Sequence, residues 1–195
     1  MIVPMKRPPP DLTSSLLAST PVLLRPEGVP RFEEVAELVG VSRATLYYYF
    51  SGQDDLLSFL LIAHVEEGAA VMAVADSGSG PVPDRLRAVI SAVATFLGER
   101  PWVCSGLLSA ASSGPQMRQV LEINDAQIAE PIRKLVTAGA GNADFHVHDA
   151  ADTTNAILGA VLMAVLGRAA RGGDPASADF RDAVVDQILR GLSPP

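Results

Sequence analysis

The sequence predicts an all-α protein, and three observations support that prediction. Glycine and proline divide the 195 residues into about nine stretches in which apolar residues recur at helical spacing, and no stretch shows the alternation of a strand. Hydrophobic residues make up 48% of the chain and charged residues only 19%, which is enough apolar material for a substantial core. Cys104 is the single cysteine, which excludes an intramolecular disulfide framework and a multi-cysteine zinc cluster.

Local signals in the first third of the chain set the bounds of three expected helices. Residues 12–24 form the first helix, in which Pro21 is expected to introduce a kink or an early end, because proline lacks a backbone N–H. The second helix spans residues 33–39. The third spans residues 42–49, and the Ser42 side chain is expected to cap its N-terminus.

Two capping patterns predict where long helices begin. Ser51 and Asp54 form an S-x-x-D pattern before an apolar pair, which predicts the start of a helix that ends near Ala75. Asp149 and Asp152 form a second capping pattern at the start of another long helix. In chain order, the helices expected after Ala75 span residues 84–99, 101–114, 116–138, 149–171 and 175–192.

Prolines mark two features of the C-terminal helices. Pro131 is expected to kink the helix at residues 116–138, since it falls in the helix interior. Asp174 and Pro175 are expected to supply the N-cap and the first-turn proline of the last helix, which ends near Leu192.

The N-terminal residues 1–10 lack the features of a secretory signal. They carry Lys6, Arg7 and three consecutive prolines in place of an apolar stretch, so they are expected to form a disordered tail. The longest uninterrupted apolar run, residues 156–167, has 12 residues, short of the roughly 20 that span a bilayer. The sequence is therefore expected to be a soluble cytoplasmic protein with no membrane partner.

The charge balance restricts how the chain could bind nucleic acid. The net charge is −7, with 13 arginines but only two lysines. Such an acidic chain is not a non-specific nucleic-acid binder, whose affinity comes from many phosphate contacts. Any contact with DNA must therefore come from a small set of locally placed donors.

Residues 32–50 have the pattern of a helix-turn-helix. Gly40 permits the left-handed conformation that ends the first helix, and Ser42 caps the second. Leu46 and Phe50 lie four residues apart, so they share the buried face of the second helix, which leaves its other positions free to enter a major groove. The outward positions offer one guanidinium, one hydroxyl and three phenols; they are Arg43, Ala44, Thr45, Tyr47, Tyr48 and Tyr49.

These residues resemble the TetR family of one-component bacterial regulators. The matching positions are, in order, Val35-Ala36, Gly40-Val41-Ser42, Thr45-Leu46-Tyr47, Tyr49-Phe50 and Leu56-Leu57. The resemblance implies a three-helix DNA-binding domain at residues 11–52 and a helical bundle at residues 53–195 for ligand binding and dimerisation.

The resemblance also implies roles for individual residues. Arg43, Ala44 and Tyr48 would face base edges, and Thr45, Tyr47 and Tyr49 would mainly hold phosphates. Ser42 would cap the recognition helix, and Leu46 and Phe50 would be core. Gln53 stands where the family usually has a lysine that grips a phosphate.

The C-terminal bundle contains two candidate sites. Apolar and polar residues that could together line a pocket for a small molecule are Phe96, Trp102, Met117, Asn124, Gln127 and Asn155. Small and apolar residues that permit close helix approach are Gly159, Ala160, Met163, Ala164, Gly167, Phe180, Val184 and Ile188. From the residues alone, the second set is either intramolecular core or a subunit interface, and the resemblance favours an interface in a homodimer.

Two further features have a functional and a plain interpretation. His146 and His148 lie near Asp149 and could suggest a metal site, but a solvated loop before a helix cap explains them better, and no metal or other cofactor is expected. Cys104 could be a redox sensor with a lowered pKa just inside a helix N-terminus, although buried inert thiols are commoner.

The sequence therefore predicts a ligand-responsive regulator without catalytic activity. A homodimer would bind a palindromic double-stranded operator as a repressor, and a small apolar effector would release it. The alternative is a helical small-molecule binding or interaction protein with a degraded DNA-binding module, since the first 57 residues are acidic and Gln53 replaces the usual lysine. An enzyme is the weakest hypothesis, because no nucleophile elbow, P-loop, dinucleotide fingerprint or HExxH motif occurs.

Overall fold

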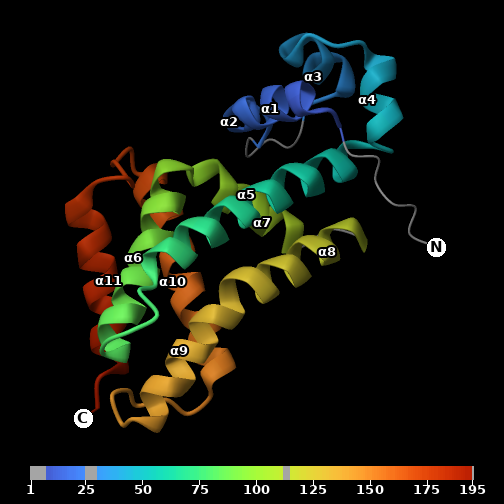
Figure 1. Ribbon diagram of the computed structural model, residues 1–195. Helices are drawn as coiled ribbons and strands as arrows, with labels where there is room; N and C mark the ends of the chain where they lie inside the picture. Colours follow the sequence, from blue (N-terminus) through green and yellow to red (C-terminus); the bar gives the residue numbers. More distant parts are fainter. Residues whose placement is uncertain (1–7, 25–29, 112–114, 195) are drawn as a thin grey trace.

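Every regular element in the part of the chain that the computed structural model describes, residues 8–24, 30–111 and 115–194, is a helix (Figure 1). The elements are α1 (Pro10–Ala18), α2 (Thr20–Leu23), α3 (Phe32–Val39), α4 (Arg43–Tyr49), α5 (Gln53–Ala75), α6 (Val82–Glu99), α7 (Pro101–Ala111), α8 (Pro115–Asn124), a π-helical segment (Asp125–Ala129), α9 (Glu130–Gly141), α10 (Ala150–Ala170) and α11 (Ala178–Leu192). The all-α prediction is confirmed. Of the expected N-terminal tail, residues 1–7 lie outside the described residues, and Pro10 is already helical.

The buried apolar residues form two clusters, and α5 contributes to both. The smaller cluster joins α1 to α4 with the first half of α5, including Leu60 and Leu61. The larger cluster joins the second half of α5, including Val65 and Met72, with the helices from α6 onward. Figure 1 shows α1 to α4 gathered at the N-terminal end of α5 and the bundle packed along the rest of it.

The break between α1 and α2 confirms the expected effect of Pro21. The first helix ends at Ala18, and Pro21 is the second residue of the short helix α2. At that position proline needs no intrahelical N–H, whereas in a continuous helix its ring would overlap the carbonyl of Leu17. The Thr20 hydroxyl, fully buried, donates to the Leu16 carbonyl across the break.

The capping prediction for α5 is wrong by one residue. Gly52 is the N-cap, and the Ser51 backbone N–H donates to Asp55 Oδ2 at 2.8 Å. Asp55, not Asp54, therefore reaches back to the chain before the helix. Because the two acids are adjacent, either one fits the sequence pattern, and only the position of the first helical residue distinguishes them.

The two C-terminal capping predictions have different outcomes. Asp149 caps α10 as expected, since its Oδ1 accepts from the Asp152 N–H at 2.8 Å. Asp174 instead accepts from the Ala176 N–H at 2.9 Å, which makes a turn before the last helix. The N-cap of α11 is Ser177, so the expected start of that helix at Pro175 is wrong by three residues.

The irregularity expected at Pro131 takes the form of a π-helical segment. Asp125–Ala129 has π-helical hydrogen bonding and connects α8 to α9, whose second residue is Pro131. A proline in a helix interior removes one hydrogen bond and overlaps the carbonyl four residues before it, here that of Gln127. The wider π turn accommodates both effects without ending the helix.

Gly98 of α6 lies against the turn that precedes α11. A Cβ added at this position would overlap the Pro175 carbonyl oxygen, which belongs to the backbone and cannot move aside by a rotamer change. We therefore expect Gly98→Ala to lower the free energy of unfolding by about 1–3 kcal/mol. Denaturant titration would check this. Gly141→Ala is the matched control because no atom lies within 4 Å of its added Cβ, and equal stability of the two variants would contradict the prediction.

Two helices are long and apolar enough, by length and composition alone, to cross a membrane. They are α5, with 44% of its most apolar window buried, and α10, with 22% buried. Such helices also occur in the cores of proteins that do not span membranes, and α5 belongs to both apolar clusters here. The low burial of α10 leaves an apolar face at the surface of the protomer.

Candidate DNA-binding interface and candidate ligand sites

The turn between α3 and α4 has the predicted helix-turn-helix geometry. Gly40 has a φ of 73°, in the left-handed region that glycine adopts without a Cβ clash, and it ends α3. Ser42 Oγ accepts from the Thr45 N–H at 3.0 Å and so caps α4, as predicted. Leu46 and Phe50 are fully buried in the smaller cluster. Because these two side chains fix one face of α4, the opposite face is directed to solvent.

The predicted DNA contacts lie on that solvent-directed face or at its edge. Tyr47 and Tyr48 are 50% and 60% exposed, so two of the three adjacent phenols face outward, as the helical repeat requires. The other exposed candidates are Ser42, Arg43, Ala44 and Gln53, and the partly buried ones are Thr45 and Tyr49. The structure brings all eight candidates to one end of the molecule, whereas their contacts with DNA remain predictions.

Arg43 is held by partners on both helices of the motif. Its Nη1 lies 2.6 Å from Glu33 Oε1 of α3, and its Nη2 donates to the Tyr47 hydroxyl at 3.4 Å. The Tyr47 ring in turn lies 4.8 Å, centroid to centroid, from the buried ring of Phe32. The hydrogen bond to Tyr47 and the charge of Glu33 raise the pKa of Arg43, so the guanidinium stays charged. These contacts with Glu33 and Tyr47 hold the Arg43 side chain in one direction before any DNA is bound.

The remaining polar candidates also have partners within the motif. The hydroxyl groups of Ser42 and Thr45 lie 2.8 Å apart, and the rings of Tyr48 and Tyr49 meet edge to face at 5.0 Å. Gln53 Nε2 donates to the Pro30 carbonyl at 2.9 Å, which ties the start of α5 to the segment before α3. The side chain that replaces the usual lysine therefore has a structural contact as well as an exposed position.

Carboxylates outnumber cations in the described part of this region, residues 8–24 and 30–57. The cations there are Arg31 and Arg43, and the carboxylates are Asp11, Glu33, Glu34, Glu37, Asp54 and Asp55. Lys6, Arg7 and Arg25 lie outside the described residues. A duplex approaching α4 would therefore meet repulsion from most nearby charges, and Arg43 is the cation placed to oppose it.

The candidate ligand residues lie on several helices of the bundle, and the structure describes the side chains of five of the six. Phe96 is buried in the larger cluster under the Arg100 guanidinium, and Trp102 packs against both clusters. Asn124 and Gln127 are partly buried around the π-helical segment, whereas Asn155 is exposed on α10. The Met117 side chain lies outside the described residues.

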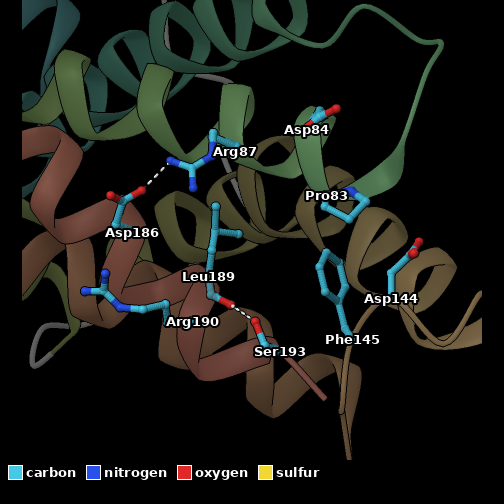
Figure 2. A pocket seen from close by; sticks show the side chains of 9 residues that line it. All are labelled: Pro83, Asp84, Arg87, Asp144, Phe145, Asp186, Leu189, Arg190 and Ser193. Carbon is cyan, nitrogen blue, oxygen red and sulfur yellow. Dashed lines mark hydrogen bonds and ion pairs between the residues drawn. The ribbon is translucent and has the colours of Figure 1, made fainter. Parts of the chain in front are cut away.

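Two described surface pockets lie at the C-terminal end of the bundle and include none of these six residues. One, of about 460 Å³, is bordered by α6 and α11, and Figure 2 shows Arg87 and Asp186 joined beside it, with Nη1 and Oδ1 2.5 Å apart. The other is a groove of about 650 Å³ between α10 and α11. Its lining includes four of the candidate interface residues: Ala160, Ala164, Val184 and Ile188.

The eight candidate interface residues all lie on α10 or α11. Gly159, Ala160 and Met163 are exposed, and Met163 is 58% exposed. The partly buried members are Ala164, Gly167, Phe180, Val184 and Ile188, of which Phe180, Val184 and Ile188 pack against the larger cluster. The set therefore combines a solvent-facing stripe on α10 with supporting side chains on α11.

The structure also bears on the two open alternatives. The rings of His146 and His148 meet edge to face at 5.1 Å beside that groove, and the described residues contain no group of three or more side chains that could hold a metal ion. Cys104 is fully buried, and burial raises the pKa of its thiol to about 12. The redox-sensor alternative, which needs a lowered pKa, is therefore contradicted, and the raised pKa agrees with the preferred interpretation of a buried, unreactive thiol.

Sequence reasoning missed one residue with an unusual environment, His64 of α5. Its side chain is buried, and its Nε2 has no hydrogen-bond partner among the described residues. The same is true of Trp102 Nε1 and Arg133 Nε. The available signal was a histidine within a long apolar run, residues 56–65, a pattern that more often marks a satisfied core histidine.

Comparisons with known proteins agree with this geometry. Residues 27–58 match the model of the family described as bacterial regulatory proteins, tetR family. No curated protein matches the chain.

Among solved structures, a bacterial regulatory protein in the tetR family from Rhodococcus RHA1 has a TM-score of 0.80 at 19% identity, over 93% of this chain and 97% of that one. The regulator PfmR from Thermus thermophilus has a TM-score of 0.73 at 20% identity, over 97% and 100%. The regulator FadR from Bacillus subtilis, in complex with stearoyl-CoA, has a TM-score of 0.76 at 16% identity, over 92% and 98%. The fold is therefore shared along almost the whole chain.

Proposed function

The chain carries the DNA-binding helix-turn-helix of the TetR family and the fold of its solved members, and on that premise we propose that it is a ligand-responsive repressor. A homodimer binds a palindromic operator, and α4 of each protomer enters the major groove. The observation that carries the proposal is the exposed face of α4, where Arg43 and Tyr48 stand on a capped helix anchored by buried Leu46. We assign no catalytic activity to the chain.

The apolar face of α10 supports the homodimer. Met163 and its small neighbours Gly159 and Ala160 leave a surface that a second copy can approach closely. A two-fold axis through this face makes an isologous interface, and it gives the assembly two recognition helices. Two such helices, about 34–36 Å apart, read a palindrome on one side of the duplex, whereas one short helix reads too few bases.

The shared helix α5 supports the response to a ligand. Only three residues separate it from α4, and it continues into the larger cluster, so a tilt of α5 moves the recognition helix. An effector that prefers the released conformation by about 1–3 kcal/mol weakens DNA binding by about 5- to 150-fold. The structural neighbour bound to stearoyl-CoA, and a second named as a fatty acid degradation regulator from Bacillus halodurans, favour a largely apolar effector.

The proposal is tested by DNA binding of the unmodified protein. Fluorescence anisotropy would compare duplexes from the DNA flanking its own gene with random duplexes of the same length, at several salt concentrations. We expect one flanking duplex to bind tightly and specifically, with an affinity that falls steeply with salt. Equal binding to both kinds of duplex would overturn the proposal. It would favour the second candidate, a helical ligand-binding protein without a working DNA module, which the acidic surface around α4 supports.

Glu33 is expected to oppose DNA binding through its ion pair with Arg43. Glu33→Gln frees the guanidinium and removes one repulsive charge, so the affinity for any duplex should rise by about 1.5- to 5-fold, the range for an exposed ion pair of about 0.2–1 kcal/mol. The control is Glu34→Gln, which removes a carboxylate from the next position of α3. Equal gains in the two variants, measured by anisotropy, would show that the pairing does not restrain Arg43.

A further inference from the structure

His64 presents a buried hydrogen-bond acceptor in the middle of α5. The side chain is only 7% exposed, and its Nδ1 lies 3.4 Å from Glu67 Oε2. Burial lowers the pKa of His64, so the ring is neutral, and the Nδ1–H donates to the Glu67 carboxylate. In that tautomer Nε2 keeps its lone pair, and it has no partner among the described residues.

Trp102 presents a buried donor in the first turn of α7. Its Nε1–H is shielded from solvent and also lacks a partner in the described part of the chain. An indole N–H can only donate. The indole packs against both apolar clusters, so it lies at the boundary between them.

Contacts of α5 on either side of His64 indicate that His64 and Trp102 lie at a similar height along α5. One turn beyond His64, Glu67 Oε1 accepts from Arg100 Nη2 at 2.9 Å. One turn before it, Leu61 Cδ2 lies 2.7 Å from the position of a Cβ on Gly106. From Arg100 to Gly106 the chain therefore passes α5 in the opposite direction, and Trp102, which lies between these two residues, is level with the part of α5 between Leu61 and Glu67.

The cluster boundary leads to the same placement. Leu61 belongs to the smaller cluster and Val65 to the larger one, so His64 stands where α5 passes from one to the other. Trp102 packs on that boundary from α7. A buried donor and a buried acceptor thus face the junction between the DNA-binding helices and the bundle.

Unpaired buried polar atoms oppose folding, so they persist where a bound molecule or an ordered water satisfies them. An O–H group placed between the two atoms would satisfy both at once. Its oxygen accepts from Trp102 Nε1–H, and its hydrogen is donated to His64 Nε2. An ester or a hydrocarbon of the same size leaves His64 Nε2 unpaired.

We propose that His64 and Trp102 form the polar recognition site for the effector, and that the effector is an apolar molecule with one O–H group that keeps its proton when bound, from an alcohol or an un-ionised carboxylic acid. The inference rests on the ligand response proposed above. It assigns the site to the junction of the two clusters, where a bound molecule contacts α5, the helix that leads to α4.

The test uses three probes with nearly the same chain: 1-decanol, decanoic acid and methyl decanoate. Trp102 is the only tryptophan, so a shift of its emission reports binding at the site. We expect 1-decanol, decanoic acid or both to bind at least tenfold more tightly than methyl decanoate. Binding of 1-decanol alone identifies a hydroxyl effector. Binding of decanoic acid that tightens as the pH falls, so that the carboxyl group keeps its proton, identifies a carboxyl effector. Affinity for methyl decanoate equal to theirs, or no binding of any probe, would overturn the proposal.

Two variants separate recognition from folding. Trp102→Phe replaces the unpaired N–H donor with an apolar group. His64→Leu removes the unpaired acceptor Nε2 together with the exposed-side contact of Nδ1 with Glu67, whose Oε1 keeps Arg100 as a partner. The melting temperature without probe should therefore stay the same or rise, while affinity for the O–H probe falls at least tenfold, as measured by ligand-dependent thermal shift. His148→Leu, which changes an exposed histidine, is the control and should bind the probe as the unmodified protein does.

The outcomes also distinguish this proposal from the repressor function. Unchanged probe affinity in both variants, with specific DNA binding intact, would overturn the site alone and leave an ordered water as the occupant. Absence of specific DNA binding by the unmodified protein would overturn the repressor function instead.

Discussion

Arg43→Ala is expected to lower the affinity for the operator by about 5- to 150-fold. A well-placed arginine that reads a base edge contributes about 1–3 kcal/mol of discrimination, and Arg43 is the cation that the structure places on the exposed face of α4. The loss should be larger for the operator than for random duplex, because a base contact carries sequence information and a phosphate contact does not. Anisotropy titrations on both duplexes measure the two losses.

The control for Arg43→Ala is Lys134→Ala, which removes the same charge from an exposed position on α9. If that variant weakens operator binding as much, the effect of Arg43 is one of net charge and not of recognition. If Arg43→Ala leaves the affinity unchanged, α4 is not the recognition helix. Tyr48→Ala provides an independent check on the same face, since its ring is the most exposed of the three phenols.

Met163→Arg is expected to convert the proposed dimer to monomers and to abolish the specific operator binding proposed above. In an isologous interface each substitution occurs twice, so two guanidinium groups would be buried near the two-fold axis without partners. Like charges brought together across an interface cost several kcal/mol, so the dimer should weaken by at least 100-fold. Light scattering coupled to gel filtration gives the mass, and anisotropy gives the loss of DNA binding.

The control for Met163→Arg is Val74→Arg, which changes an exposed apolar side chain near the C-terminal end of α5. This variant should remain dimeric and bind DNA. A Met163→Arg protein with the mass of a dimer would show that the subunits meet through another face.

The sequence predicted the start of a helix correctly where only one nearby side chain could cap the backbone. Ser42 and Asp149 each lie three residues before the N–H that they accept from, and no rival acceptor stands beside them. The prediction at Asp54 is wrong because Asp55 offers an alternative one residue away. The prediction at Asp174 is wrong because its carboxylate accepts from the Ala176 N–H in a turn before α11, and Ser177 is the N-cap residue without a side-chain hydrogen bond. Local chemistry identifies the capping residue types, whereas tertiary packing selects among neighbours.

Some features of the candidate site likewise follow from local sequence, whereas others depend on tertiary packing. Exposure of Tyr47 and Tyr48 follows from helical geometry, because adjacent positions cannot share one buried face. The pairing of Arg43 with Glu33 depends on the angle between α3 and α4, which no local pattern encodes. The proximity proposed for His64 and Trp102 likewise depends on how α5 packs against α7, which is far from it in sequence.

The helix α5 contributes to both apolar clusters, and this has a consequence for recombination between proteins of this fold. A crossover at the start of α5 would pack α1 to α4 against side chains from another protein at Leu56, Leu60 and Leu61. These three residues complete the smaller cluster. A crossover near Val65 would leave the smaller cluster unchanged and exchange only the bundle that forms the larger cluster. Functional hybrids, natural or engineered, should therefore carry their parental junction about three helical turns into α5.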